Sequence, residues 1–272
     1  MATVIETNTT PWETVDVDAV TLDVIENAIQ NARVQMDAIL FRTAISTIIR
    51  EQRDGFPVLT DRDGQMLAGQ FGSPVDGFID NYEGDVQEGD VLLTNDPYAC
   101  DGAISHLNDW LVCTPVYYHG RLLGWAAMFG HMSDISGSTA ASMPVTSTDI
   151  LQEGIVIPPV KVVSKGELQQ DIVRLAVRNS RTPDWNEADF YAILSACRTG
   201  AARLVEMADR FGPDVLVSAQ KQLLARNREA MRELIVSTMP EEKVVFEDWI
   251  CDDALGYGPY KMGCEMWREG DK

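Results

Sequence analysis

The chain contains 272 residues, of which 45% are hydrophobic, and this is enough to bury a substantial core in one large domain or two small ones. It carries 42 acidic against 22 basic residues, for a formal net charge of -20, which argues against a nucleic acid as partner because no basic surface would neutralise the phosphates. The N-terminal residues are acidic and polar, and no apolar run reaches the ~20 residues of a membrane span, so we expect a cytoplasmic protein without membrane contact.

The first predicted element is a long amphipathic helix that begins after Asp18. Its apolar residues recur at steps of three and four, and they are Ile25, Ile29, Ala32, Met36 and Leu40. Asp18 is a suitable N-cap, because a carboxylate can accept hydrogen bonds from the first free backbone N–H groups of a helix. We therefore expect this helix to pack one face against a core.

From Phe56 to about Phe129 the apolar pattern shortens to the alternation typical of strands. FPVLT and QMLAGQF flank a turn at residues 61–64, DVLLT follows, and DWLVCTPVYY and RLLGWAAMF flank His119-Gly120. Such runs around short Gly-containing turns predict hairpins in a mixed or antiparallel sheet. The next stretch, Gly130 to Val163, is rich in Gly, Ser, Thr and Pro, and irregular stretches of this length often form binding sites.

Three helices are predicted after this stretch. Their apolar faces are Leu168, Ile172 and Leu175 in the first, Phe190, Leu194, Cys197, Ala201 and Leu204 in the second, and Leu216, Leu223, Met231 and Leu234 in the third. In the second helix Asp184 and Glu187 form a capping-box-like start, and Gly212-Pro213 predicts the end.

After Pro240 the pattern returns to strands, in KVVFEDWICDD and then YKMGCEMW. We expect a missing C-terminal segment or a second chain to cover them, because unpaired apolar edges invite association. The predicted fold class is α+β, a mixed or antiparallel sheet with an N-terminal helix, a C-terminal helical hairpin region and the start of a further β segment. The expected parts are residues 1–163, with the N-terminal helix and the β-rich metal-site region, the helical residues 164–240, and the β segment 241–272.

Two of the three histidines lie in polar, turn-rich contexts that suit metal ligands. His106 precedes Asp109 by three residues, and His131 follows the strand that should return beside Asp109. Two imidazoles and a carboxylate at one end of a hairpin would form an open site for Zn, Mn or Fe, with positions left for water or substrate. The alternative is that both histidines are hydrogen-bonded loop residues.

Other polar residues are weaker candidates. Asp54 could supply a further oxygen ligand, or could simply form the turn with the glycine that follows it. Asp134 could orient His131 as a catalytic carboxylate, or cap the loop after it. The residues at 95–98 are interpreted as a turn, and the basic residues at 178–181 as the cap of a helix C-terminus rather than an anion site.

The sequence lacks the usual motifs of nucleotide and serine-hydrolase sites. No GxxxxGK[ST] loop, GxGxxG after a strand or GxSxG elbow is present, so any ATP chemistry would belong to another chain. The five cysteines are widely spaced without a CxxC pair, which favours reduced core thiols over disulfides or a zinc knuckle.

Several segments resemble the hydantoinase B family, over residues 18–267. They are NDPYACDGAISHLNDWLVCTPVY, GHMSDISG, SMPVTSTDILQEGIVIPPVKVV and VRNSRTPDWNEADFYAILSACRTGAARLVEMADRFG. The family includes the B subunits of ATP-dependent hydantoinases and caprolactamase, part of 5-oxoprolinase, and the metal-bearing subunits of acetone and acetophenone carboxylases. The resemblance implies that His106, Asp109 and His131 bind a divalent transition metal, with Asp54 as a further ligand.

Two positions depart from the family pattern. Met132 stands where many members carry a second histidine, and Ser136-Gly137 where they carry a pair of glycines. A thioether binds hard ions poorly and cannot take up a proton, so a mechanism that needs that second imidazole would fail here. Family chains also normally extend further, which implies a split subunit or a fragment.

The resemblance implies a division of labour between two chains. A hydantoinase A-type subunit would use ATP to phosphorylate the carbonyl oxygen of a small-molecule substrate, and the metal subunit would act on the activated product. We expect ketone carboxylation of the acetone or acetophenone carboxylase type, with ATP-dependent hydrolysis of a cyclic amide as the alternative. A third hypothesis is an assembly subunit with a vestigial site, against which the intact set of His106, Asp109 and His131 argues.

Overall fold

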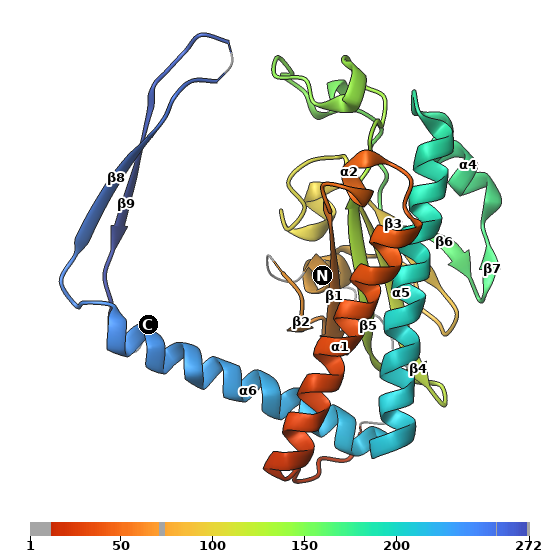
Figure 1. Cartoon of the computed structure of the whole chain (residues 1–272), viewed down its shortest axis with the longest axis vertical. Helices are drawn as coiled ribbons and strands as arrows, with labels where there is room; N and C mark the ends of the chain where they lie inside the picture. Colours follow the sequence, from red (N-terminus) through yellow and green to blue (C-terminus); the bar gives the residue numbers. More distant parts are fainter. Residues whose placement is uncertain (1–11, 71–73, 254, 271–272) are drawn as a thin grey trace.

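The computed structural model describes residues 12–70, 74–253 and 255–270, and its centre is a seven-stranded sheet (Figure 1). The strands are β1 (Gly55–Asp61), β2 (Met66–Ala68), β3 (Val91–Thr94), β4 (Asp109–Tyr118), β5 (Arg121–His131), β6 (Val160–Ser164) and β7 (Glu167–Leu168). Their order is β2-β1-β5-β4-β3-β6-β7, and every neighbouring pair is antiparallel. The α+β class and both predicted hairpins, β1–β2 and β4–β5, are confirmed.

Two long helices, α1 (Ala19–Thr43) and α5 (Pro183–Phe211), lie against each other on one face of the sheet (Figure 1). α1 begins as predicted, because Asp18 Oδ1 accepts hydrogen bonds of 3.0 Å from the backbone N–H groups of Val20 and Thr21. Its predicted apolar face is buried from Ile25 to Leu40. The two helices and the sheet enclose the main hydrophobic core.

The opposite face of the sheet packs against α3 (Pro74–Asn81) and the 3-10 helix η1 (Pro97–Cys100) around a smaller apolar cluster. Successive strand residues point to opposite faces, so β4 sends Trp110 and Val112 to the main core and Leu111 and Cys113 to the smaller cluster. Burial on both faces fixes the register of the β4–β5 hairpin, because a slip by one residue would exchange the two faces. The remaining short helices are α2 (Thr47–Arg50), η2 (Ala140–Ser142) and η3 (Ile150–Gln152).

The first helix of the predicted helical region, α4 (Gln170–Arg178), buries the predicted face only in part. Leu168 and Ile172 pack against the main core as predicted, although Leu168 belongs to strand β7. The prediction was wrong for Leu175, which is 66% exposed, whereas the fully buried residues are Val173, Ala176 and Val177. The buried positions follow the predicted ones by one residue, because the helix begins only at Gln170, after the β6–β7 hairpin, and packs against α5 and β6.

The predicted start of α5 is also corrected. Its N-cap is Thr182 without a side-chain cap bond, and Pro183 occupies the first turn, so Asp184 lies inside the helix. There its charge meets the positive end of the helix dipole instead of closing a capping box. The predicted end is confirmed, since Gly212 has a φ of 87° and Pro213 opens α6 (Pro213–Thr238). Of the helices in the described ranges, none combines the length and the apolarity that crossing a membrane would need.

α6 runs away from the sheet and leads to a hairpin of β8 (Val244–Ile250) and β9 (Tyr260–Met266), which stands clear of the rest of the chain (Figure 1). Every residue of both strands is exposed. Cross-strand partners share a face, and one face carries Val244, Phe246, Ile250, Tyr260, Met262 and Met266. The other face carries the ion pairs Lys261–Glu247 and Lys243–Glu265 together with Val245 and Trp249, so the first face is the more apolar of the two, although it includes Asp248.

Candidate metal centre

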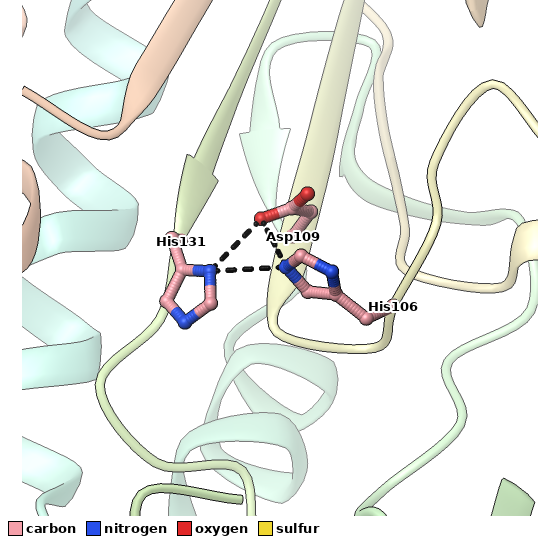
Figure 2. A group of neighbouring side chains, drawn as sticks. All are labelled: His106, Asp109 and His131. Atoms are coloured by element: carbon pink, nitrogen blue, oxygen red, sulfur yellow. Dashed lines mark hydrogen bonds and ion pairs between the residues drawn. The ribbon is translucent and has the colours of Figure 1, made fainter. Parts of the chain in front are cut away.

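His106, Asp109 and His131 converge at one end of the β4–β5 hairpin (Figure 2). Asp109 is the first residue of β4 and pairs directly with His131, the last residue of β5. Asp109 Oδ1 lies 3.2 Å from His106 Nε2 and 3.3 Å from His131 Nδ1, and the two nitrogens are 3.1 Å apart. The predicted return of His131 to Asp109 is therefore confirmed, whereas metal binding stays a prediction.

These three atoms have the separations and the chemistry of a metal-ligand set. Donors around a cation with bonds of about 2.1 Å are separated by about 3.0 to 3.4 Å, which matches the nearly equal sides of this triangle. Asp109 Oδ1 is buried and lies 3.2 and 3.3 Å from the two imidazole nitrogens, so a cation bound between the three atoms would meet its lone pairs. His131 and Asp109 are buried and His106 is half-buried, which leaves one side of the group open.

The electrostatics of the group favour negative charge on Asp109. Burial alone would raise the pKa of Asp109, but the imidazoles of His106 and His131 outweigh burial and hold that pKa below its usual value. The hydrogen bond with Asp109 raises the pKa of His106, against the opposing effect of burial. An ionised carboxylate is the form that a divalent cation requires.

Backbone hydrogen bonds fix the two ends of the hairpin that carry these ligands. The N–H of His131 donates to the carbonyl of Asp54 at 3.1 Å, and the N–H of Met132 donates to the carbonyl of Asn108 at 2.8 Å. The buried side chain of Asn108 returns a 3.0 Å bond to the carbonyl of Met132. Asn108 and Met132, the sequence neighbours of Asp109 and His131, are thus bonded to each other, and the backbone of His131 is also bonded to Asp54.

Asp54 lies at the edge of the group. Its Oδ2 is 3.7 Å from His131 Nδ1, farther than any separation within the triangle, and its side chain is 41% exposed. The described residues within mutual ligand distance are His106, Asp109 and His131 only. Ligation by Asp54 therefore stays a prediction, while its carbonyl has an observed role in positioning His131.

Asp134 organises the loop that follows His131. Its Oδ1 accepts hydrogen bonds from the backbone N–H groups of Ser136 and Arg181, and its Oδ2 from the N–H of Ala141 and from Arg181 Nη1, all of 2.9 to 3.0 Å. Burial opposes ionisation, but these donors outweigh it and hold the pKa of Asp134 below its usual value. The contacts are those of the loop-capping alternative, and a catalytic role for Asp134 stays a prediction.

Arg181 was interpreted from sequence as part of a helix cap, and this is corrected. Its guanidinium donates to the carbonyls of Ser136, Gly137 and Thr139 as well as to Asp134. It therefore ties the loop after β5 to the start of α5. The sequence gives no signal for these partners because they lie more than 40 residues away.

The departures from the family pattern leave the three ligands unaffected. The side chain of Met132 is fully buried in the main core, so it neither supplies nor blocks a donor at the metal centre. Ser136 and Gly137 have φ values of 84° and 79°, in the left-handed region that favours glycine. A Cβ on Gly137 would lie 2.3 Å from the carbonyl oxygen of Glu153, so only the second position requires glycine for space.

Asn95, which was predicted from the sequence to lie in a turn, supports the loop that carries His106. It is fully buried, and its Nδ2 donates to the carbonyls of Leu107 and Ile155 at 2.7 and 2.9 Å. Its Oδ1 accepts the N–H of Ile157 at 2.7 Å. One side chain thus connects the loop that carries His106 with the segment before β6.

Comparison with known proteins gives one family for almost the whole chain. The family described as Hydantoinase B/oxoprolinase matches residues 18–271. Caprolactamase subunit beta of Pseudomonas jessenii is 32% identical over 268 residues, which cover 94% of this chain and 45% of the relative. A 5-oxoprolinase of Dictyostelium discoideum is 33% identical over 232 residues, which cover 82% of this chain and 18% of the relative. The acetophenone carboxylase delta subunit of Aromatoleum aromaticum is 27% identical over 192 residues, which cover 67% of this chain and 28% of the relative.

Two solved structures are similar over most of the chain. The ATP-dependent caprolactamase from Pseudomonas jessenii has a TM-score of 0.83 at 28% identity and covers 95% of this chain and 45% of its own. The nucleotide-free acetone carboxylase has a TM-score of 0.79 at 16% identity, and the match covers 92% of this chain and 36% of that chain. This likeness shows the fold alone. The chain spans less than half the length of each of these relatives.

Proposed function

Because this chain belongs to the Hydantoinase B/oxoprolinase family, we propose that it supplies the metal centre of an ATP-dependent enzyme that hydrolyses a cyclic amide. The observation that carries this proposal is the 32% identity to caprolactamase subunit beta over 94% of the chain. The 5-oxoprolinase match, at 33% identity, supports the same reaction class, because both names denote enzymes acting on lactams.

Ketone carboxylation, the reaction predicted from the sequence, becomes the second candidate. The acetophenone carboxylase delta subunit is 27% identical over 67% of this chain, a lower identity over a shorter stretch than the caprolactamase match. The acetone carboxylase likeness, at 16% identity, adds no argument about the reaction. The relatives therefore favour the hydrolytic alternative.

The metal centre would supply Lewis-acid chemistry to this reaction. A divalent ion such as Zn, Mn or Fe, held by His106, Asp109 and His131, would polarise an oxygen and lower the pKa of a water molecule. Of the chain's own residues, Asp109 contributes the negative charge, and His106 directs Nε2 inward while its Nδ1 lies 3.2 Å from Ser105 Oγ. Asp54, 3.7 Å from His131 Nδ1, is our candidate for a further oxygen ligand.

ATP would enter through another subunit. This chain has no phosphate-binding loop motif, so we propose a hydantoinase A-type partner that phosphorylates the amide oxygen of the substrate. Phosphorylation turns a poor electrophile into one that water can attack. The exposed apolar face of β8–β9 supports a further segment or a second chain as an additional contact.

The test is to purify the chain with its partner subunit and without chelators, and to measure metal content and ADP release. We expect a stoichiometric transition metal and ADP release that depends on a lactam and not on bicarbonate. The His106→Ala variant should lose both. ADP release that requires a ketone and bicarbonate would establish the second candidate, and a complex without metal would favour the assembly subunit.

A further inference from the structure

An open groove of about 470 Å³ lies along the outer face of α4 and reaches the start of α5. Its lining residues are Asp171, Arg174, Leu175, Val177, Arg178 and Pro183. Those at 171, 174, 175 and 178 have the spacing of neighbours on one face of a helix. The lining contains none of the three residues of the candidate metal centre, so the groove is a separate feature of the molecule.

The side chains on this face of α4 have few partners of their own. Leu175 is 66% exposed, because α4 packs against α5 and β6 through its other side (Figure 1). Arg178 makes no hydrogen bond or ion pair within the described parts of the chain. Asp171 and Arg174 lie 3.7 Å apart with both side chains exposed, and such a pair contributes little to stability. The face therefore offers an apolar side chain and charges at both of its ends to another molecule.

The groove is slightly basic although the chain is strongly acidic. Two guanidinium groups and one carboxylate line it, for a local charge of +1, whereas the whole chain carries -20. Two copies of so acidic a chain repel each other over most of their surface, so they approach most easily through a face that is not acidic. The local charge therefore permits a contact between two copies of this chain at α4.

The charge pattern of α4 is complementary to itself when the helix is reversed. Asp171 lies in the first turn, and Arg178 is the last residue, about 10.5 Å further along the helix axis. When two copies of α4 pack antiparallel about a two-fold axis between positions 174 and 175, Asp171 of each copy faces Arg178 of the other copy. The same axis places Leu175 of each copy against Leu175 and the aliphatic stem of Arg174 of the other. Both end charges then have opposite partners, and the exposed leucine is covered.

We propose that the outer face of α4 is a contact surface between two copies of this chain, with Leu175 at its centre and an Asp171–Arg178 ion pair at each end. A helix of 9 residues buries less area than a standard protein interface, so we expect a dissociation constant on the order of 0.1 mM for the isolated chain. Weak contacts of this kind become effective when other subunits already hold two copies together. The contact requires neither a metal nor a substrate, so it is independent of the proposed function.

The test is a charge exchange, measured by sedimentation velocity at protein concentrations up to about 0.5 mM, above the expected dissociation constant. Asp171→Arg and Arg178→Asp are made singly and together. Because the two-fold axis repeats each ion pair, either single substitution sets like charges against each other at both ends of the contact. Each should weaken the dimer about ten-fold. The double variant restores two opposite pairs and should recover the wild-type dissociation constant within about three-fold.

Two controls separate this contact from other causes of association. All samples carry Phe246→Ser and Met262→Ser, which remove exposed apolar side chains of β8–β9 from the measurement. Arg198→Asp makes the same charge change as Arg178→Asp at an exposed position of α5, and it should leave the dimer unchanged.

The stability of α4 responds in the opposite direction to the dimer. An acid in the first turn and a base in the last turn both favour the helix dipole, so the midpoint of thermal unfolding should be lowest in the double variant. Recovery of the dimer in that variant therefore cannot come from a more stable helix. Leu175→Ser should weaken the dimer about ten-fold and leave the midpoint nearly unchanged, because the side chain is 66% exposed in the monomer.

Three results would overturn the inference: a chain that stays monomeric over the whole concentration range, single variants that dimerise as tightly as wild type, or a double variant no tighter than the single ones. None of these results bears on the proposed function, which is tested by the metal content and the ADP release of the complex.

Discussion

Asp109 and His131 are direct register partners in the β4–β5 hairpin, and Asp109 Oδ1 lies 3.3 Å from His131 Nδ1. The register of the hairpin is fixed by burial on both of its faces, so the geometry of this pair depends on the core rather than on the loop. The loop adds His106 as the third member. Two of the three residues of the candidate metal centre therefore lie on paired strands, and the third lies in a loop.

We predict that His106→Ala and His131→Ala lower metal affinity by at least about ten-fold, because each removes one of three ligands. His106→Ala should leave the midpoint of thermal unfolding of the metal-free protein nearly unchanged, since His106 is half-buried at a loop. Metal content after dialysis, measured by elemental analysis, checks this. The control is His119→Ala, which removes a histidine from the turn of the same hairpin. Equal metal loss in all three variants would reject the assignment.

We predict that Asp54→Asn weakens metal retention more than it weakens folding. The carboxylate lies 3.7 Å from His131 Nδ1 and is 41% exposed, whereas the structural bond to His131 comes from the backbone carbonyl, which the substitution keeps. Metal affinity by competition with a chelator, together with urea unfolding of the metal-free protein, separates the two effects. Asp63→Asn, in the turn between β1 and β2, is the control. Wild-type affinity in Asp54→Asn would leave Asp54 as a backbone support only.

We predict that Asn95→Asp lowers metal affinity. Aspartate keeps the acceptor for the N–H of Ile157 but loses both donor bonds, to Leu107 and Ile155, so the loop that carries His106 is released from the segment before β6. Loss of buried hydrogen bonds should also cost about 1 to 3 kcal/mol of unfolding free energy. The visible spectrum of the Co²⁺-loaded protein reports a change in ligand geometry that a loss of stability alone would not produce. Asn27→Asp, an exposed amide on α1, is the control.

We predict that Asp134→Asn lowers the unfolding free energy by about 2 kcal/mol at pH 7, because it removes a buried carboxylate with four donors. The folded pKa of Asp134 lies below its usual value, so its stabilising contribution is present above the unfolded pKa and is lost as pH falls through the folded pKa. The difference between wild type and variant should therefore shrink below about pH 4. Urea unfolding at several pH values measures it. Asp171→Asn, from an exposed pair with Arg174, should show no such difference.

We predict that the apolar face of β8–β9 mediates association of the isolated chain. Phe246 is 64% exposed and Met262 55%, on the same face as Val244 and Ile250. Replacing Phe246 and Met262 by Ser should shift the chain toward monomer in light scattering at micromolar concentration. The matched control replaces Val245 and Trp249, on the charged face, by Ser. A wild-type chain that is already monomeric would contradict the prediction.

The sequence by itself determined the elements whose pattern is local. The α1 helix with its Asp18 cap, the two hairpins and the end of α5 at Gly212 follow from side-chain period, capping chemistry and turn residues within a few positions. The approach of His131 to Asp109 was also predictable, because a hairpin turn sets the register of its strands. The division into residues 1–163, 164–240 and 241–272 remains a prediction.

Only the tertiary structure decided which polar side chains serve the site and which serve the fold. Asp134 and its partner Arg181 are 47 residues apart in sequence, and Asn95 bonds to Ile155 across 60 residues. No local pattern encodes such pairs, so Asn95 was read as a turn residue and Arg181 as a helix cap. The exposure of Leu175 on α4 was missed for a related reason, since the packing of α4 against α5 and β6 fixed which residues of the helix are buried. The spacing of apolar residues and the capping residues report on one or two helical turns of sequence. The long-range contacts exist only after the sheet has brought distant segments together.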